Sequence, residues 1–193
     1  MNTAVKLYDE DFEIIEGKKI MSPAANMSHH GIIMRLVLGI GGYCEEHDDC
    51  GYVFADSIDL HLPDGNLFKP DFTLVLKENE NIIDWKGSIN GVPDMVAEVL
   101  SKSTKKNDLT VKKNIYERNG VKVYWIIDPW AKSVSVYLLR DGKYFLEDEY
   151  IYFDEKDLSL LRDREKAEVK FEVPIHLFEN FRIKLAYLFK WCP

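Results

Sequence analysis

Residues 93–128 constrain the fold most, because they combine a buried strand, a polar turn, an amphipathic helix and a second buried strand in direct succession. In the first strand, over 93–100, Val96, Glu98 and Leu100 alternate onto one face. An ionised carboxylate in an apolar strand costs free energy unless a cation or hydrogen-bond donors compensate it. The pattern therefore predicts that Glu98 has a specific partner.

The helix that follows carries a lysine on its apolar face. It is expected to begin at Asn107 or Asp108, either of which can cap it, and to end at Gly120. At about 100° per residue, Lys112 and Asp108 fall inside the apolar stripe, whereas Lys113 falls outside it. The stripe consists of Leu109, Val111, Ile115 and Tyr116. An Asp108–Lys112 pair that satisfies only itself explains this pattern equally well.

The residues before this unit predict a helix and a long hairpin. The helix is expected from about His29 to Glu46, with Ser28 as its N-cap. The hairpin arms are expected over 52–62 and 67–76, around the turn Pro63-Asp64-Gly65-Asn66. One face of the second arm should present Phe68, Phe72, Leu74 and Leu76, and Asp71 should lie on the other. The polar stretch 77–92 is expected to be a loop.

Beyond the helix, a strand is expected over 121–128, followed by a meander through 134–146 with a turn at Asp141-Gly142. Residues 154–170 are densely charged and predict a surface loop or helix, and 171–193 are amphipathic. The order of elements predicts an α/β fold with a mixed central sheet and flanking helices. The length of 193 residues and the apolar fraction of 46% indicate one domain with a sizeable core.

Charge and cysteine content bound the function. The net charge of −8 argues against indiscriminate coating of DNA, although residues 101–122 carry seven basic and two acidic side chains. A solvated helix face explains such a run equally well. The cysteines form no CxxC pair, which predicts neither a zinc site nor a disulfide framework and favours the cytoplasm. The most apolar run, 31–43, is interrupted by Arg35 and is too short to span a membrane.

Asp71, Glu98 and Lys112 remain as the candidate catalytic side chains. Asp94 lies on the same strand as Glu98 but roughly 13 Å away, too far to share one ion. Asp71 lies on a different strand, and neighbouring strands are only about 4.8 Å apart. Two hard carboxylates favour Mg²⁺ or Mn²⁺. His29 and His30 are adjacent and point apart on a helix, so capping or surface placement is expected for them rather than metal ligation.

Three segments resemble the Uma2 (DUF820) family of candidate restriction endonucleases, within the PD-(D/E)xK nuclease superfamily. They are Pro70-Asp71, GVPDMVAEVLSKST at 91–104 and NDLTVKKNIYERNGVKVYWIIDP at 107–129. The resemblance covers about 20–150. It implies a restriction-endonuclease-like core of α-β-β-β-α-β within a single domain, 1–193, with 151–193 as a C-terminal extension.

The resemblance also implies roles. Asp71 and Glu98 would hold the metal, with the backbone carbonyl of Val99 as a third ligand. The superfamily places its lysine two positions after the glutamate, where this chain has Leu100, and Lys112 matches the family's replacement on the next helix. The residues implied to support these groups are Ser101, Asp108 and Tyr116. Those implied to contact phosphates are Lys102, Lys105 and Lys106.

The implied function is Mg²⁺-dependent hydrolysis of phosphodiester bonds in DNA. Two alternatives remain open at this point. One is a nucleic-acid-binding or assembly module that keeps the nuclease scaffold without cleaving, and the other is a wholly structural role for the buried charges. Because cutting both strands with one site per chain needs two copies, a homodimer is expected, with Phe189 and Trp191 as candidate interface residues.

Overall fold

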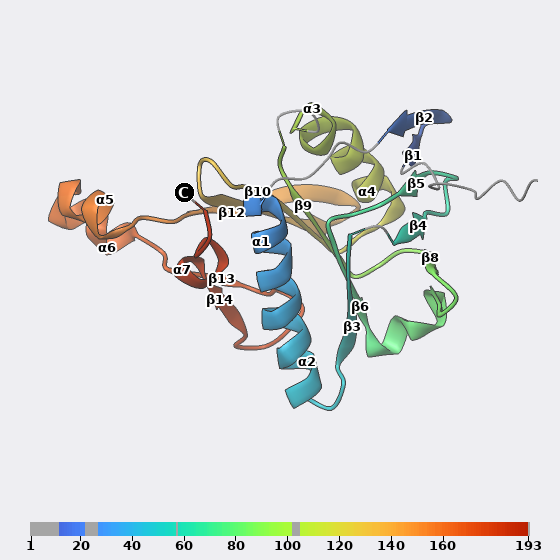
Figure 1. The fold of residues 1–193 in the computed structure, drawn as a ribbon, viewed down its shortest axis with the longest axis horizontal. Coiled ribbons are helices and arrows are strands. Elements are labelled where there is room, and N and C mark those ends of the chain that lie inside the picture. The colour runs from blue at the N-terminus through green and yellow to red at the C-terminus, as the bar shows by residue number, and fades with distance from the viewer. Residues whose placement is uncertain (1–11, 22–26, 57, 102–104, 193) are drawn as a thin grey trace, which may run out of the picture.

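The computed structural model describes residues 12–21, 27–56, 58–101 and 105–192. Its centre is a six-stranded mixed sheet in the order β12-β11-β10-β9-β6-β3 (Figure 1). Strands β9 and β10 are parallel, and the other neighbours are antiparallel. The strands are β3 (Gly51–Ala55), β6 (Phe72–Leu76), β9 (Met95–Val99), β10 (Val123–Asp128), β11 (Ser133–Arg140) and β12 (Lys143–Ile151).

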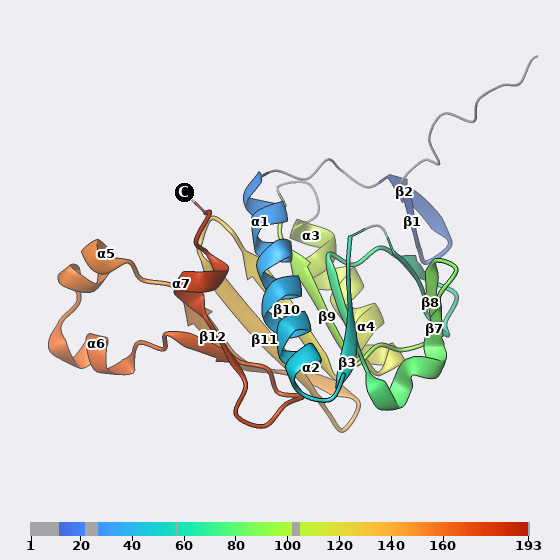
Figure 2. The same cartoon turned by 60° about the horizontal axis from the view of Figure 1, so that its bottom comes forward.

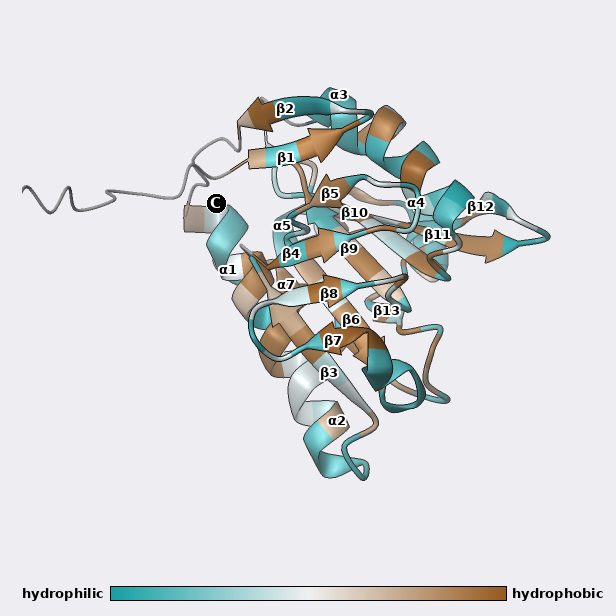
Figure 3. Ribbon diagram, turned by 90° about the vertical axis from the view of Figure 1, so that its right-hand side faces the viewer, coloured by the Kyte–Doolittle hydropathy of each residue, from teal (hydrophilic) through white to brown (hydrophobic). Residues whose placement is uncertain are grey.

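A second six-stranded sheet lies beside the central one. Its strands are in the order β2-β1-β5-β4-β8-β7, and Figure 3 shows them in this order from top to bottom. Its strands are β1 (Phe12–Ile15), β2 (Lys18–Met21), β4 (Asp59–His61), β5 (Leu67–Phe68), β7 (Ile83–Asp84) and β8 (Ser88–Asn90). Apart from these short strands, the central elements follow the predicted order α-β-β-β-α-β. The predicted fold class is therefore confirmed.

One face of the central sheet is covered by a continuous helix made of α1 (Met27–Leu36), the π turn η1 (Val37–Gly41) and α2 (Gly42–Glu46) (Figure 2). The helix ends where it was predicted to end. The chain is already helical at Met27, so Ser28 lies in the first turn and the prediction that it is the N-cap is wrong. A Cβ on Gly41 would lie 2.9 Å from Cγ2 of Val53, so a glycine allows the helix to approach β3 this closely.

The other face carries the crossover helix between β9 and β10. It consists of α3 (Lys105–Asn107), the π turn η3 (Asp108–Lys112) and α4 (Lys113–Asn119). Asn107 is already helical, with φ −67° and ψ −44°, so the prediction of a cap at 107 or 108 is wrong. Gly120 ends the helix with φ +92°, as predicted. Leu109 is 39% exposed, because the π turn alters the angular spacing assumed for a regular helix.

The predicted alternation along β9 is confirmed. Met95, Ala97 and Val99 belong to the core beneath α1, and Val96 and Leu100 belong to the core beneath α4. Glu98 shares the face of Val96 and therefore points toward α4 and the second sheet. The fold thus places this carboxylate in an interior bounded by two sheets and a helix.

The predicted hairpin exists, but each arm is divided between the two sheets. The arms pair as β3 with β6 in the central sheet and as β4 with β5 in the second sheet. Pro70 lies at the break in the second arm, where it can donate no ladder hydrogen bond. Phe68 and Phe72 consequently enter different cores, so the prediction that they share a face is wrong.

Residues 77–92 are not a loop, contrary to the prediction. They form the 3₁₀ helix η2 (Lys77–Ile82) and the strands β7 and β8. Strand β8 pairs in parallel with β4, whose residues lie about thirty positions earlier in the chain. Strands of two or three residues are too short for a periodic signal, so pairing defines them: β8 with the distant β4, and β7 with β8.

The charged residues after β12 form two capped helices, α5 (Glu155–Leu160) and α6 (Asp163–Glu168), which project from the body in Figures 1 and 2. The chain then returns through β13 (Glu172–Pro174), β14 (Arg182–Lys184) and α7 (Leu185–Leu188). Phe189 is only 2% exposed, so it closes the core and is not available to a dimer interface, whereas Trp191 is 54% exposed. No helix in the described part of the chain is long and apolar enough to cross a membrane.

Asp94 fixes the start of β9. Its side chain is 1% exposed and accepts hydrogen bonds from the backbone N–H of Leu76 at 2.9 Å, from Nδ2 of Asn79 at 2.8 Å and from Nζ of Lys122 at 2.8 Å. We expect Asp94→Ala to lower the free energy of unfolding by about 2–3 kcal/mol, because it leaves a buried N–H without its acceptor. Urea denaturation checks this value. A loss below about 0.5 kcal/mol would contradict the assigned role.

Candidate active site

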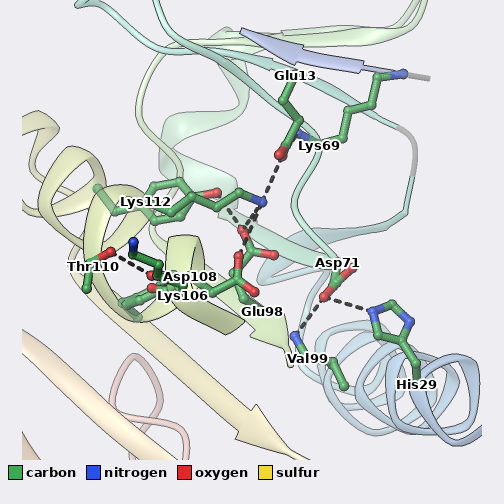
Figure 4. A network of polar contacts seen from close by, with 12 residues as sticks. Glu13, His29, Lys69, Asp71, Glu98, Val99, Lys106, Asp108, Thr110 and Lys112 are labelled. Carbon is green, nitrogen blue, oxygen red and sulfur yellow. Dashed lines mark hydrogen bonds and ion pairs between the residues drawn. The ribbon is translucent and has the colours of Figure 1, made fainter. Parts of the chain in front are cut away.

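Glu98 lies at the centre of a buried polar network (Figure 4). Its side chain is almost fully buried, and Oε1 accepts hydrogen bonds from the hydroxyl of Tyr116 at 2.9 Å and from Nζ of Lys112 at 3.2 Å. Strand β9 supplies the carboxylate, and the crossover helix supplies both donors. The network therefore depends on the strand–helix unit recognised in the sequence.

The ammonium of Lys112 points inward, as the helical angle predicted, and the residue is 4% exposed. Its nearest carboxylate is Glu13, with Nζ 2.8 Å from Oε1, followed by Glu98 at 3.2 Å and Asp108 at 3.6 Å. The pairing of Lys112 with Asp108 alone is therefore not what the structure contains. Glu13, on β1, was missed by sequence reasoning, because no motif or periodicity connects it to a helix about one hundred residues later.

Asp71 lies immediately before the start of β6, beside β9. The antiparallel register pairs Phe72 with Ala97, which brings the preceding Asp71 to the end of β9. Its Oδ2 accepts the backbone N–H of Val99 at 2.7 Å and lies 3.1 Å from Nε2 of His29. His29 is 6% exposed, so the expectation of a capping or surface histidine is wrong. Helix α1 instead delivers an imidazole to the site from the opposite face of the sheet.

Comparison with known proteins identifies the family of this chain. The profile of the Uma2 family, described as "Putative restriction endonuclease", matches residues 4–163. The chain belongs to the Uma2 family. A crystal structure described as a "putative nuclease belonging to DUF820" from Anabaena variabilis ATCC 29413 is similar, with a TM-score of 0.70, 19% sequence identity, and coverage of 94% of this chain and 91% of that chain. Among curated proteins, none matches significantly.

Membership in the Uma2 family assigns the chain to a nuclease class in general terms. The structural similarity shows that the two proteins share a fold. The family's coarse function agrees with the position of the site, which lies where paired strands and a crossover helix bring carboxylates and an amine together.

Electrostatics in this Uma2 site favour an added cation. Burial raises the pKa of Glu98 well above its usual range, although Lys112 acts in the opposite direction. The carboxylates of Asp108, Asp71 and Glu13 raise it further. Burial opposes the charge on Lys112, but the carboxylates of Glu98, Glu13 and Asp108 outweigh burial and hold the pKa of the ammonium above its usual range. Lys112 stays charged, and without another cation the acids around it favour a protonated Glu98.

The donor set fits a hard divalent ion. Three carboxyl groups, from Glu13, Glu98 and Asp108, lie within 3.6 Å of the Lys112 ammonium. Asp71 pairs with His29, so the four acids and the ammonium carry a formal charge of −3 when all four acids are ionised and His29 is neutral. Oxygen ligands with surplus negative charge suit Mg²⁺ or Mn²⁺. Within the described ranges, no three His, Cys, Asp or Glu side chains are grouped as a ready metal site. A metal would therefore rely on two carboxylates and on backbone or solvent oxygens.

Asp71 contacts His29, and the surroundings of His29 change the pKa of its imidazole. Burial lowers the pKa of His29, but the hydrogen bond to Asp71 and the carboxylates of Asp71, Asp56 and Asp108 outweigh burial, so the pKa is raised overall. A protonated imidazole would stabilise the ionised form of Asp71. His29 therefore favours an ionised carboxylate on Asp71, at the start of β6.

The other residues predicted to belong to the site, Ser101 and the lysines at 102, 105 and 106, lie after β9 and at the start of the crossover helix. Ser101 lies two residues after the end of β9, and its backbone carbonyl accepts the N–H of Lys105. Lys102 lies outside the described residues. The side chains of Lys105 and Lys106 are exposed, and Nζ of Lys105 lies 2.9 Å from Asp128. Other cations of the basic segment are already bound to acids: Lys112 in the core, Arg118 to Asp64, and Lys122 to Asp94. The segment is thus not a continuous phosphate-binding surface.

Proposed function

We propose that this Uma2-family chain is a Mg²⁺- or Mn²⁺-dependent endonuclease that hydrolyses phosphodiester bonds in DNA. The observation that carries the proposal is the convergence of Asp71, Glu98 and Lys112 from two paired strands and the crossover helix. A structural role alone would not require several carboxyl groups around one ammonium in the interior, because burying like charges together destabilises a fold.

Asp71, Glu98 and the backbone carbonyl of Val99 would hold the ion. When bound, the ion supplies Lewis acidity that stabilises charge developing on the phosphodiester. Tyr116 orients Glu98 through its hydroxyl, and His29 orients Asp71 through Nε2. These contacts fix the carboxylates before substrate arrives, which lowers the cost of organising the site.

Lys112 acts as a fixed positive charge in the proposed reaction. Its ammonium remains protonated because the surrounding acids raise its pKa. A preorganised cation in a water-poor site stabilises negative charge on the reacting phosphate more strongly than the same cation in water. Its contact with Glu13 holds the ammonium from the side opposite the helix. Glu13 is therefore proposed as a positioning residue for Lys112.

Lys102, Lys105 and Lys106 are proposed to contact the phosphate backbone. Lys105 and Lys106 begin the crossover helix, near the end of β9 that carries Glu98. Contacts of this kind give affinity that falls with salt and carries little sequence information. Lys105 already contacts Asp128, so a phosphate must compete with that carboxylate, which predicts modest affinity.

The proposal is tested by nicking of supercoiled plasmid in Mg²⁺ or Mn²⁺, comparing wild type with Glu98→Gln. Glutamine keeps an oxygen that accepts from Tyr116 and Lys112 but removes the anionic ligand, so cleavage should fall on the order of 100-fold. A chelator should abolish wild-type cleavage. Equal cleavage by both proteins would exclude this site. Salt-sensitive DNA binding without cleavage in the wild type would favour the non-cleaving binding module.

A further inference from the structure

Two cysteines outside the candidate active site have their sulfur atoms in contact. Sγ of Cys50 lies 2.8 Å from Sγ of Cys44, six residues earlier in the chain. Cys44 lies in the last turn of the α1–α2 helix and is 2% exposed. Cys50 is partly exposed and immediately precedes β3. Both are free thiols. The spacing of the cysteines in the sequence did not predict this contact. The turn between α2 and β3 brings the two sulfur atoms together.

The backbone holds the two cysteines together. The N–H of Cys50 lies 3.4 Å from the carbonyl oxygen of Cys44, which also accepts the N–H of His47. Asp48 and Asp49 have φ values of 56° and 52°, and these consecutive left-handed residues return the chain to the helix end. On the other side, the carbonyl of Cys50 accepts the N–H of Lys77, which anchors it to the end of β6. Bridging therefore needs little backbone movement.

We propose that Cys44 and Cys50 are an oxidisable dithiol, a modification site at which a small-molecule disulfide such as oxidised glutathione converts two thiols into an intramolecular disulfide. The reaction is thiol–disulfide exchange. The deprotonated sulfur of Cys50 attacks the reagent, whose sulfur–sulfur bond breaks and releases one thiol. The sulfur of Cys44 then attacks the mixed disulfide and releases the second thiol. The cysteines lose two electrons and two protons, which the two released thiols carry.

Exposure determines which cysteine reacts first. Cys50 is accessible, whereas Cys44 is enclosed in the core beneath the helix. Burial and the neighbouring Cys50 raise the pKa of the Cys44 thiol to about 12, so Cys44 is a poor initial nucleophile. Cys192 serves as an internal control, because it lies away from the pair. Its side chain hydrogen-bonds with Ser28, at the opposite end of the α1–α2 helix.

The disulfide would join the end of α2 to the start of β3. Closing this seven-residue ring restricts the unfolded chain more than the folded one, in which the sulfurs already touch. Oxidation should therefore raise Tm by about 5 °C. The bridge lies at the end of β3 that pairs with Leu76, whereas Asp71 lies beyond the other end of β6. The inference is therefore independent of the proposed nuclease function.

The test uses the full chain carrying Cys192→Ser, which leaves only Cys44 and Cys50. After equilibration with excess oxidised glutathione under native conditions, titratable thiols should fall from two to none. The intact mass should lose two hydrogens without a glutathione adduct, and Tm should rise. In wild type, thiols should fall from three to one. A Cys50→Ala variant should leave Cys44 reduced in the same buffer.

Two results would overturn the proposal. One is persistence of both thiols in the Cys192→Ser protein at equilibrium. The other is a stable glutathione adduct on Cys50, which would show that Cys44 cannot complete the exchange. Both results are measured on the Cys192→Ser protein, which retains Cys44 and Cys50. Misfolding of the Cys50→Ala variant would therefore not change the outcome of the test.

Discussion

Lys112→Met is expected to lower the free energy of unfolding by about 3–5 kcal/mol, among the largest effects of any substitution in this chain. Methionine fills much of the volume of the lysine stem but supplies no charge. The variant leaves Glu13, Glu98 and Asp108 facing one another in the interior without the ammonium that lies within 3.6 Å of each. Thermal unfolding should show a fall in Tm of roughly 10 °C.

The loss should depend on pH. The folded-state pKa of Glu98 is raised above its unfolded value, so its contribution to stability is present below the unfolded pKa and is lost as pH rises through the folded pKa. Removing Lys112 raises the folded pKa further, so the variant should recover stability relative to wild type as pH falls from the raised folded-state pKa of Glu98 toward its unfolded value.

Two companion proteins make the Lys112 prediction specific. Lys106→Met, on the exposed side of the same helix, should change stability by less than about 0.5 kcal/mol. Adding Glu98→Gln to Lys112→Met should restore part of the loss, because one of the uncompensated acids is removed. A Lys112→Met protein within about 1 kcal/mol of wild type at neutral pH would show that the acids are neutralised in some other way.

Asp71→Ala is expected to reduce DNA cleavage on the order of 10²–10³-fold, if the proposed function holds, because it removes one of the two metal-binding carboxylates. Asp94→Ala is its matched control, since each residue follows a proline and begins one of two adjacent strands. Asp94 is bound by Leu76, Asn79 and Lys122, away from the Glu98 network. Its loss should lower stability and leave the cleavage rate per folded molecule unchanged.

Initial nicking rates in Mn²⁺, measured at a temperature where circular dichroism shows both variants folded, separate these effects. The two aspartates should give opposite profiles: Asp71→Ala impaired in rate, Asp94→Ala impaired in stability. Equal loss of rate in both variants would mean that cleavage reports folding rather than the proposed metal ligands. Equal retention of rate would remove Asp71 from the site.

Local sequence determined much of the architecture. The alternation of Val96, Glu98 and Leu100 identified the face of β9, because side chains on a strand point alternately to its two sides. The angular position of Lys112 placed its amine inside, because nearby apolar residues define the buried side of a helix. Gly120 marked the helix end through the left-handed conformation that glycine adopts readily. Each of these signals acts over a few residues.

Only the tertiary structure decided what surrounds the inward carboxylate and amine. Glu13 comes from a distant hairpin, and His29 comes from a helix on the opposite face of the sheet. Helical spacing from Ile32, Ile33 and Leu36 puts His29 on the buried side of its helix, but no local pattern specifies Asp71 as its partner. The division of the hairpin between two sheets and the contact of Cys44 with Cys50 likewise depend on pairing and on chain reversal. Periodicity specifies which side of an element is buried. Which charges meet there is fixed by packing between elements far apart in the chain, and short-range patterns carry no information about it.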